Sequence, residues 1–123
     1  MENSISVAIV DDEPMLVKTY EKLLRRRQIP IAFSAYSGEE AVAKFKEASP
    51  RPGIVILDYR MGRMNGLEVM KAILAEEPGT KVIFISGDGD ARGLSLASGA
   101  MHFLKKPVHI EEIMAAIRTA TGE

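Results

Sequence analysis

The stretch Ile54-Val55-Ile56-Leu57-Asp58 decides the fold of this chain. Four aliphatic residues in a row, rich in β-branched side chains, predict a strand that is buried on both faces. In an open parallel sheet, ligands and chemistry gather just beyond the carboxyl ends of the strands. Asp58 therefore stands where a functional carboxylate is expected. Taken alone, the five residues also fit a strand that ends in a capping or turn aspartate.

The composition limits the classes of protein to which this chain can belong. The chain has 123 residues, of which 46% are hydrophobic and 27% are charged, so we expect one globular domain over residues 1–123. The net charge of −1 would attract neither nucleic acid nor an anionic membrane. Cysteine is absent, which excludes disulfides, thiolate catalysis and zinc–thiolate sites. Residues 1–4 carry no leader pattern and no apolar run approaches the ~20 residues of a membrane span, so we expect a cytoplasmic protein.

Apolar runs alternate with helical patterns along the whole chain. The runs predict five strands, over residues 5–10, 31–36, 54–58, 81–86 and 101–104. Pro14 marks the start of the first helix, Ser37 the cap of the second and Ile110 the start of the last. The fourth helix, within residues 87–98, should be short and loose, because each of its three glycines costs about 1 kcal/mol relative to alanine.

Five successive strand–helix units define the fold class as α/β. Such alternation implies a parallel sheet with helices on both faces, and right-handed crossovers leave few topologies. For a chain of this length, the best match is the flavodoxin-like strand order 2-1-3-4-5, a (βα)5 sandwich of three layers.

Polar side chains follow the ends of four predicted strands. Asp11 and Asp12 follow the first, Asp58 ends the third, Ser86 ends the fourth, and Lys106 follows the fifth. In the order 2-1-3-4-5 the first and third strands are neighbours, so we expect the three carboxylates to converge beside the hydroxyl and the amine. Crowded carboxylates favour a hard cation such as Mg²⁺, which also binds phosphate oxygens. The set therefore predicts phosphoryl transfer with an aspartate nucleophile.

Each of these residues also has a plain structural explanation. Acids before Pro14 suit the N-terminus of a helix, Ser86 suits a turn, and Lys106 suits an exposed surface. Their predicted convergence at one edge of the sheet favours the functional explanation. His102 and His109 lack ligand partners at useful spacing, and we expect both to be surface or capping residues.

The polar residues at the strand ends match a known motif set: Asp11-Asp12, Asp58, Ser86 and Lys106-Pro107. With this set the chain resembles the receiver domain of two-component response regulators, in its single-domain chemotaxis-regulator form. The resemblance covers essentially the whole chain. It implies that a sensor histidine kinase or a phosphotransfer protein donates a phosphoryl group to Asp58. It also implies an unknown output protein that binds the face made by the fourth helix, the fifth strand and the fifth helix.

The resemblance implies a role for each site residue. Asp12, Asp58 and the backbone carbonyl of Arg60 would ligate Mg²⁺, with Asp11 acting mainly through water. Lys106 would contact the phosphoryl oxygens and would precede a cis peptide bond.

Two further pairs would control the phosphorylated state. Ser86 and Phe103 would form a switch, in which the hydroxyl moves to the phosphate and the ring turns inward; Phe103 alternatively is an ordinary core aromatic. Arg60 and Asp88, each two residues after a site residue, should sit over the mouth of the site. We expect them to pair as a lid, the alternative being two solvated charges.

The chain departs from the family pattern after the phosphoacceptor. The turn that commonly reads Met-Pro-x-Met-Asp-Gly is here Met-Gly-Arg-Met-Asn-Gly, so Gly62 replaces a proline and loosens the loop. Asn65 can still cap the third helix. Two other functions stay open: a receiver-like interaction module that does not use phosphorylation, and an aspartyl-phosphate phosphohydrolase. The second usually needs an acid two residues after the nucleophile, where this chain has Arg60.

Overall fold

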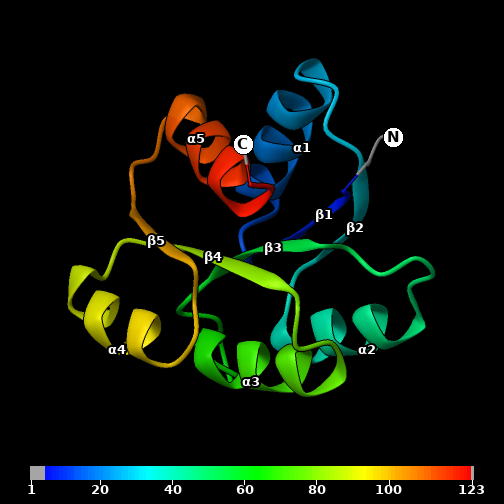
Figure 1. The fold of residues 1–123 in the computed structure, drawn as a ribbon. Coiled ribbons are helices and arrows are strands. Elements are labelled where there is room, and N and C mark those ends of the chain that lie inside the picture. The colour runs from blue at the N-terminus through cyan, green and yellow to red at the C-terminus, as the bar shows by residue number, and fades with distance from the viewer. Residues whose placement is uncertain (1–4, 123) are drawn as a thin grey trace.

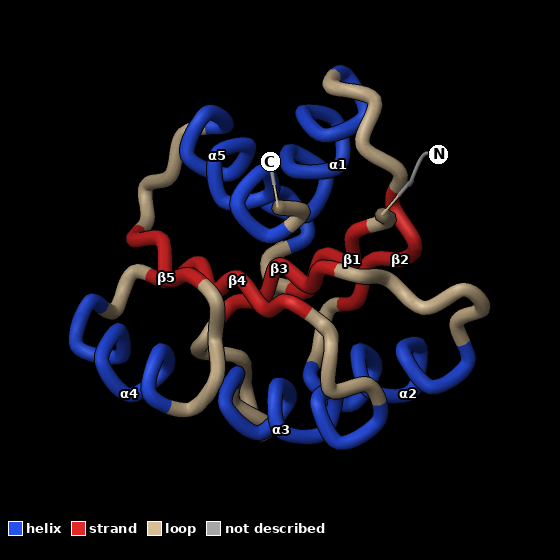
Figure 2. Tube along the Cα trace, viewed as in Figure 1, coloured by secondary structure: helices blue, strands red, loops and turns tan. Residues whose placement is uncertain are grey.

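The computed structural model describes residues 5–122. Residues 1–4 and 123 lie outside this part. The expectations about the N-terminal segment and about the outer limits of the domain therefore fall outside the described residues. The described chain forms three layers (Figures 1 and 2). A central sheet lies between α1 and α5 on one face and α2, α3 and α4 on the other.

All five strands are parallel, and the sheet has the predicted order β2-β1-β3-β4-β5. The strands are β1 (Val7–Val10), β2 (Ile31–Ala35), β3 (Ile54–Asp58), β4 (Lys81–Ser86) and β5 (His102–Lys105). The chain therefore has the flavodoxin-like α/β architecture that the alternation of its elements predicts.

The helices follow the strands in strict alternation. They are α1 (Pro14–Arg26), α2 (Gly38–Glu47), α3 (Gly66–Glu76), α4 (Arg92–Ala97) and α5 (Ile110–Ala120), with a short 3-10 turn η1 (Gly89–Ala91) before α4. The fourth helix is short, as its glycines predict. Among residues 5–122, none of the helices has both the length and the apolar character needed to cross a bilayer.

Side-chain caps set the starts of α2 and α3. The Glu40 N–H donates to Ser37 Oγ at 3.0 Å. At α3 the Glu68 N–H donates to Asn65 Oδ1 at 3.0 Å, and the Glu68 carboxylate accepts the Asn65 N–H at 2.9 Å. The second pair is a full capping box, so Asn65 caps α3 as predicted.

Three strands have limits that differ from the prediction. The first starts at Val7 instead of residue 5, and the fifth lies one residue further along the chain, at His102–Lys105 instead of residues 101–104. The second ends at Ala35, because the Tyr36 N–H donates to the Glu40 carboxylate at 2.7 Å. Limits of this kind depend on which backbone groups find partners, and hydrophobic patterns do not report this.

The core explains why β3 is an unbroken apolar run. Val55 and Leu57 pack into the cluster on the side of α2 and α3, whereas Ile54 and Ile56 pack into the cluster on the side of α1 and α5. All four are at most 2% exposed. Because both faces are covered, neither set of alternating side chains is polar, and the first polar residue is Asp58, which ends the strand.

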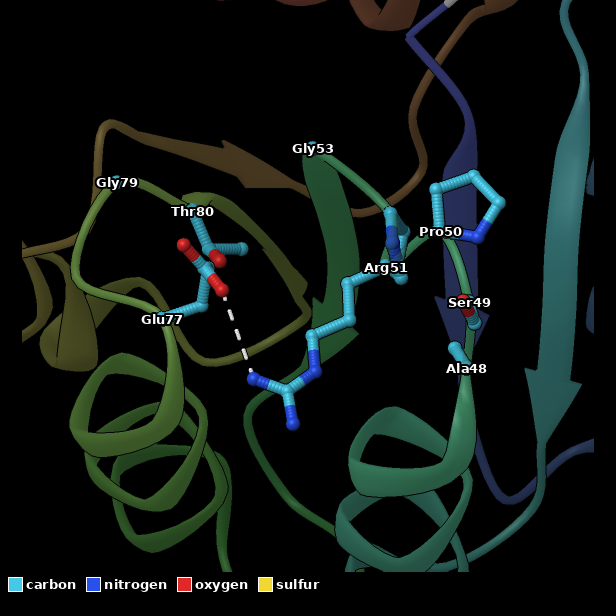
Figure 3. A pocket seen from close by; sticks show the side chains of 9 residues that line it. Ala48, Ser49, Pro50, Arg51, Gly53, Glu77, Gly79 and Thr80 are labelled. Carbon is cyan, nitrogen blue, oxygen red and sulfur yellow. Dashed lines mark hydrogen bonds and ion pairs between the residues drawn. The ribbon is translucent and has the colours of Figure 1, made fainter.

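Arg51 lies at the edge of the sheet where β3 and β4 begin. A cavity of about 550 Å³ lies there, between the loops that precede β3 and β4 (Figure 3). The Arg51 guanidinium donates to the Glu76 carboxylate at 3.0 Å, lies 3.5 Å from Glu77 Oε1 and sits 5.5 Å from the centre of the Phe45 ring. It also donates to the Lys46 and Glu76 carbonyls, so its positive charge stabilises the C-terminal ends of α2 and α3.

Candidate functional site

Three carboxylates converge at the carboxyl edge of the sheet. Asp11 and Asp12 follow β1, and Asp58 ends β3, the neighbouring strand. One oxygen from each lies within 4.8 Å of the others. Asp11 is 2% exposed and Asp58 7%, whereas Asp12 reaches solvent. The adjacency of β1 and β3 therefore creates the acidic cluster that the sequence predicts.

Lys106 delivers its ammonium to this cluster. Its Nζ lies 3.2 Å from Asp11 Oδ2, 3.6 Å from Asp58 Oδ2 and 3.8 Å from Glu13 Oε1. The peptide bond between Lys106 and Pro107 is cis, as expected. Burial alone would lower the pKa of Lys106, but the charges of Asp11 and Asp58 outweigh it and the pKa is raised. The ammonium is therefore retained at neutral pH.

The Asp58 carboxyl has a pKa that is raised by its surroundings. Burial raises its pKa, and the charge of Asp11 adds to this, so the pKa reaches about 6 in spite of the opposing charge of Lys106. Asp11 has both oxygens engaged: Oδ1 accepts the Glu13 N–H at 3.0 Å, and Oδ2 accepts from Lys106. Most of the shift at Asp58 thus comes from being buried beside another carboxylate.

Ser86 and Phe103 occupy the neighbouring strands. Ser86 ends β4 and is 1% exposed, and its Oγ accepts the Asp88 N–H at 3.1 Å. Phe103, in β5, is 4% exposed and its ring centre lies 6.5 Å from that of Phe84. The ring is thus already packed inward in this structure, in the core cluster beneath α3 and α4.

Arg60 and Asp88 form the predicted pair. The Arg60 Nε donates to Asp88 Oδ2 at 2.9 Å, and a second guanidinium nitrogen contacts the same oxygen. The Arg60 N–H lies 3.4 Å from Asp58 Oδ1, which places the pair next to the cluster. The side chains are 71% and 20% exposed, so the bridge lies at the surface.

The loop after Asp58 is shaped by two glycines. Gly62 has a φ of +51°, a left-handed conformation, and a Cβ there would meet nothing within 4 Å. Gly66 donates its N–H to the Tyr59 carbonyl at 2.7 Å and closes the loop. Met61, 3% exposed, anchors the loop in the core.

Two residues near the lysine were not predicted as part of the site. Glu13, read as a helix-capping acid, has its carboxylate 3.8 Å from Lys106; its place directly after the acid pair was the available signal. Tyr20 lines a cavity together with Lys106, and only the presence of a phenol on an apolar helix face hinted at this.

The two histidines fall in different places. His109 is exposed and forms the N-cap of α5, where its N–H donates to the Glu112 carboxylate at 2.9 Å, as expected for a capping residue. His102 is half-buried in β5, and within residues 5–122 its Nε2 has no hydrogen-bond partner. The expectation of a surface or capping residue was therefore wrong for His102, which lies within β5 with its Nε2 buried.

The fold and the site together define a class: a doubly wound α/β domain whose acidic pocket, at the switch point of the sheet and beside a lysine, fits phosphoryl acceptance. The model of the response regulator receiver domain family matches residues 7–118. The chain belongs to this family, the receiver domains of two-component systems.

Chemotaxis proteins are among its relatives. The chain is 31% identical to CheY of Listeria monocytogenes over 119 residues, which covers 94% of this chain and 98% of the relative. It is 31% identical to CheY of Thermotoga maritima over 113 residues, covering 90% and 92%. The similarity therefore extends over nearly the full length of this chain and of each relative.

Solved structures agree with this assignment. A receiver domain from Clostridium thermocellum superposes with a TM-score of 0.90 at 27% identity, covering 96% of this chain and 94% of that one. CheY of Borrelia burgdorferi, solved as a complex with CheX, BeF3 and Mg²⁺, superposes with a TM-score of 0.88 at 30% identity, covering 95% and 89%.

Proposed function

We propose that residues 1–123 form one phosphorylation-dependent receiver domain that acts in the cytoplasm. Asp58 accepts a phosphoryl group from a phosphohistidine of a sensor histidine kinase or a phosphotransfer protein. The observation that carries the proposal is the convergence of three carboxylates within 4.8 Å beside the Lys106 ammonium. A surface cluster of acids would not combine a nearly buried aspartate with a paired lysine.

The donor set fits Mg²⁺. All its side-chain ligand atoms are carboxylate oxygens, which hard cations prefer. Both oxygens of Asp11 are already engaged, so Asp12 and Asp58 would bind the ion directly with the Arg60 carbonyl, and Asp11 would act through water. When bound, Mg²⁺ supplies charge neutralisation for the phosphoryl oxygens. The Mg²⁺ and BeF3 in the Borrelia burgdorferi complex support the assignment.

In the proposed reaction, Asp58 provides the nucleophile. One carboxylate oxygen attacks the phosphorus atom, the P–N bond breaks, and the imidazole of the donor leaves with the bonding electron pair and keeps a proton on its ring. Lys106 turns from Asp11 to a phosphoryl oxygen, and the Ser86 hydroxyl exchanges the Asp88 N–H for a hydrogen bond to phosphate. The Phe103 ring, which is already packed inward, keeps the space behind the hydroxyl filled.

The signal then passes to an output protein. We place its binding surface on the face of α4, β5 and α5, where Leu94 and Leu96 of α4 are 55% and 37% exposed. Solvent-exposed leucines on a short helix offer apolar contacts that a partner would cover.

Incubation with acetyl phosphate or phosphoramidate and Mg²⁺, followed by intact-mass measurement, tests the proposal. We expect one added phosphoryl group in the wild type and none in Asp58→Asn or in the presence of EDTA. Addition that persists in Asp58→Asn would contradict the assignment of the phosphoacceptor. No addition at all, with no Mg²⁺ binding, would favour the module that does not use phosphorylation.

The Arg60–Asp88 bridge should lengthen the life of the phosphoryl group by restricting the approach of water. Replacing Arg60 by alanine is expected to speed dephosphorylation a few-fold, measured after removal of the phosphodonor. Arg63→Ala, which removes the same charge from the same loop, should leave the half-life unchanged. Equal half-lives for Arg60→Ala and wild type would exclude the lid.

The phosphohydrolase alternative lacks its general acid. The residue two places after Asp58 is Arg60, a cation bound to Asp88. We therefore expect no turnover of small phosphate esters, and a colorimetric phosphatase assay would expose such turnover directly.

A further inference from the structure

Lys106 lies between two very different surroundings. On one side its ammonium contacts Asp11 and approaches Asp58. On the other side the residue lines a largely apolar cavity of about 400 Å³ between α1 and α5. A lysine stem is long and flexible, so its ammonium keeps one position only if packing removes the alternatives. The residues that line the cavity therefore set how far the stem can turn away from Asp58.

Tyr20 is the one aromatic residue on that cavity. It is 5% exposed and lies on the face of α1 with Val17 and Leu24, both fully buried. Burial raises the pKa of Tyr20, and the positive charge of Lys106, which acts in the opposite direction, is the strongest of the charges on the phenol, in agreement with the place of both residues on one cavity. A buried ring and a flexible stem thus share one cavity wall.

We propose that Tyr20 is a positioning residue for Lys106: its ring occupies the space behind the lysine stem and so holds the ammonium over Asp58. The inference rests on the proposed function, because the ammonium has to meet a phosphoryl group there. A leucine at position 20 would keep the helix face apolar but would enlarge the cavity beside the lysine stem, which gives the stem more positions to adopt. The ring therefore acts through its bulk, and a phenylalanine would serve equally well.

A double-mutant cycle tests this coupling. We expect Tyr20→Leu to slow phosphoryl uptake from acetyl phosphate about tenfold, because misplaced reacting groups lose rate steeply. In a Lys106→Met background the same substitution should have no further effect. Tyr20→Phe should behave as wild type. Equal losses in both backgrounds would show that Tyr20 acts without Lys106 and would overturn the proposal.

A structural control separates positioning from general loosening. Leu24→Ala creates a cavity one turn further along the same buried face of α1, so it should lower stability yet keep the uptake rate while the protein is folded. A tenfold loss of rate in Leu24→Ala would overturn the specific role of Tyr20.

A readout without phosphorylation separates this inference from the proposed function. The lysine ammonium groups are followed by ¹H–¹⁵N NMR, and we expect a slowly exchanging Lys106 signal that Tyr20→Leu abolishes. If the wild type shows this behaviour but takes up no phosphoryl group, the positioning role stands and the proposed function fails. If phosphorylation occurs and Tyr20→Leu changes neither signal nor rate, the positioning role fails and the proposed function stands.

Discussion

Asp58→Asn is expected to stabilise the metal-free protein by about 2–3 kcal/mol at pH 7. The pKa of Asp58 rises from 3.8 to about 6 on folding, and each pKa unit corresponds to about 1.4 kcal/mol. The cause is the burial of a charge beside Asp11, with Lys106 compensating only in part. Asparagine has a similar shape and no charge, so it removes this cost.

The same effect gives a defined pH dependence. Because the folded state binds the Asp58 proton more tightly than the unfolded state, this group favours folding most below pH 3.8. Its contribution is lost as the pH rises from 3.8 to about 6, and it is constant above that. The stability difference between Asp58→Asn and wild type should therefore grow over this interval, as urea unfolding in EDTA would measure.

Magnesium should reverse the ranking. A cation that binds only the folded wild type stabilises it in proportion to the logarithm of its concentration. Asp58→Asn lacks a ligand and should gain little. If the variant were less stable than wild type in EDTA, or if Mg²⁺ stabilised both equally, the description of Asp58 as a crowded metal-binding carboxylate would be wrong.

Gly66→Ala should strongly destabilise the loop after Asp58. An added Cβ would lie 2.5 Å from Phe84 Cε1, 2.9 Å from the Asp58 carbonyl oxygen and 2.9 Å from Tyr59 Cα. Two of these atoms are backbone and cannot turn aside. We expect a loss of about 3 kcal/mol, together with weaker Mg²⁺ binding, because the displaced loop carries the Arg60 carbonyl.

Gly79→Ala is the matched control. A Cβ at Gly79 meets nothing within 4 Å, so that substitution should leave both stability and Mg²⁺ affinity nearly unchanged. Thermal unfolding and titration with Mg²⁺ measure the two effects for each variant. A Gly66→Ala protein as stable as Gly79→Ala would show that the loop after Asp58 yields more easily than its contacts indicate.

Much of the site could be predicted because each helix and strand has a recognisable pattern within a short stretch of sequence. The buried run before Asp58 identifies a central strand, and the alternation of strands and helices then restricts the topology. Once the order of the strands is known, Asp11 and Asp58 must be neighbours. The end of β2 could not be predicted in this way, since it depends on the bond from the Tyr36 N–H to Glu40. Likewise the phenol of Tyr20 looks like any core residue until Lys106 is placed next to it.

By itself, the sequence determined the elements, their order in the sheet and the carboxylates at the strand ends. Hydrophobic periodicity and the residues that begin or end helices and strands act within a few residues of one another. Only the tertiary structure decided which atoms of these charged groups meet and at what distances. Lys106 and Asp11 are 95 residues apart, and Arg60 and Asp88 are 28 apart. Such contacts depend on side-chain direction and on burial from several elements at once. Burial and the neighbouring charge of Asp11 raise the pKa of Asp58, and the depth of that burial is set by the elements that pack around the site.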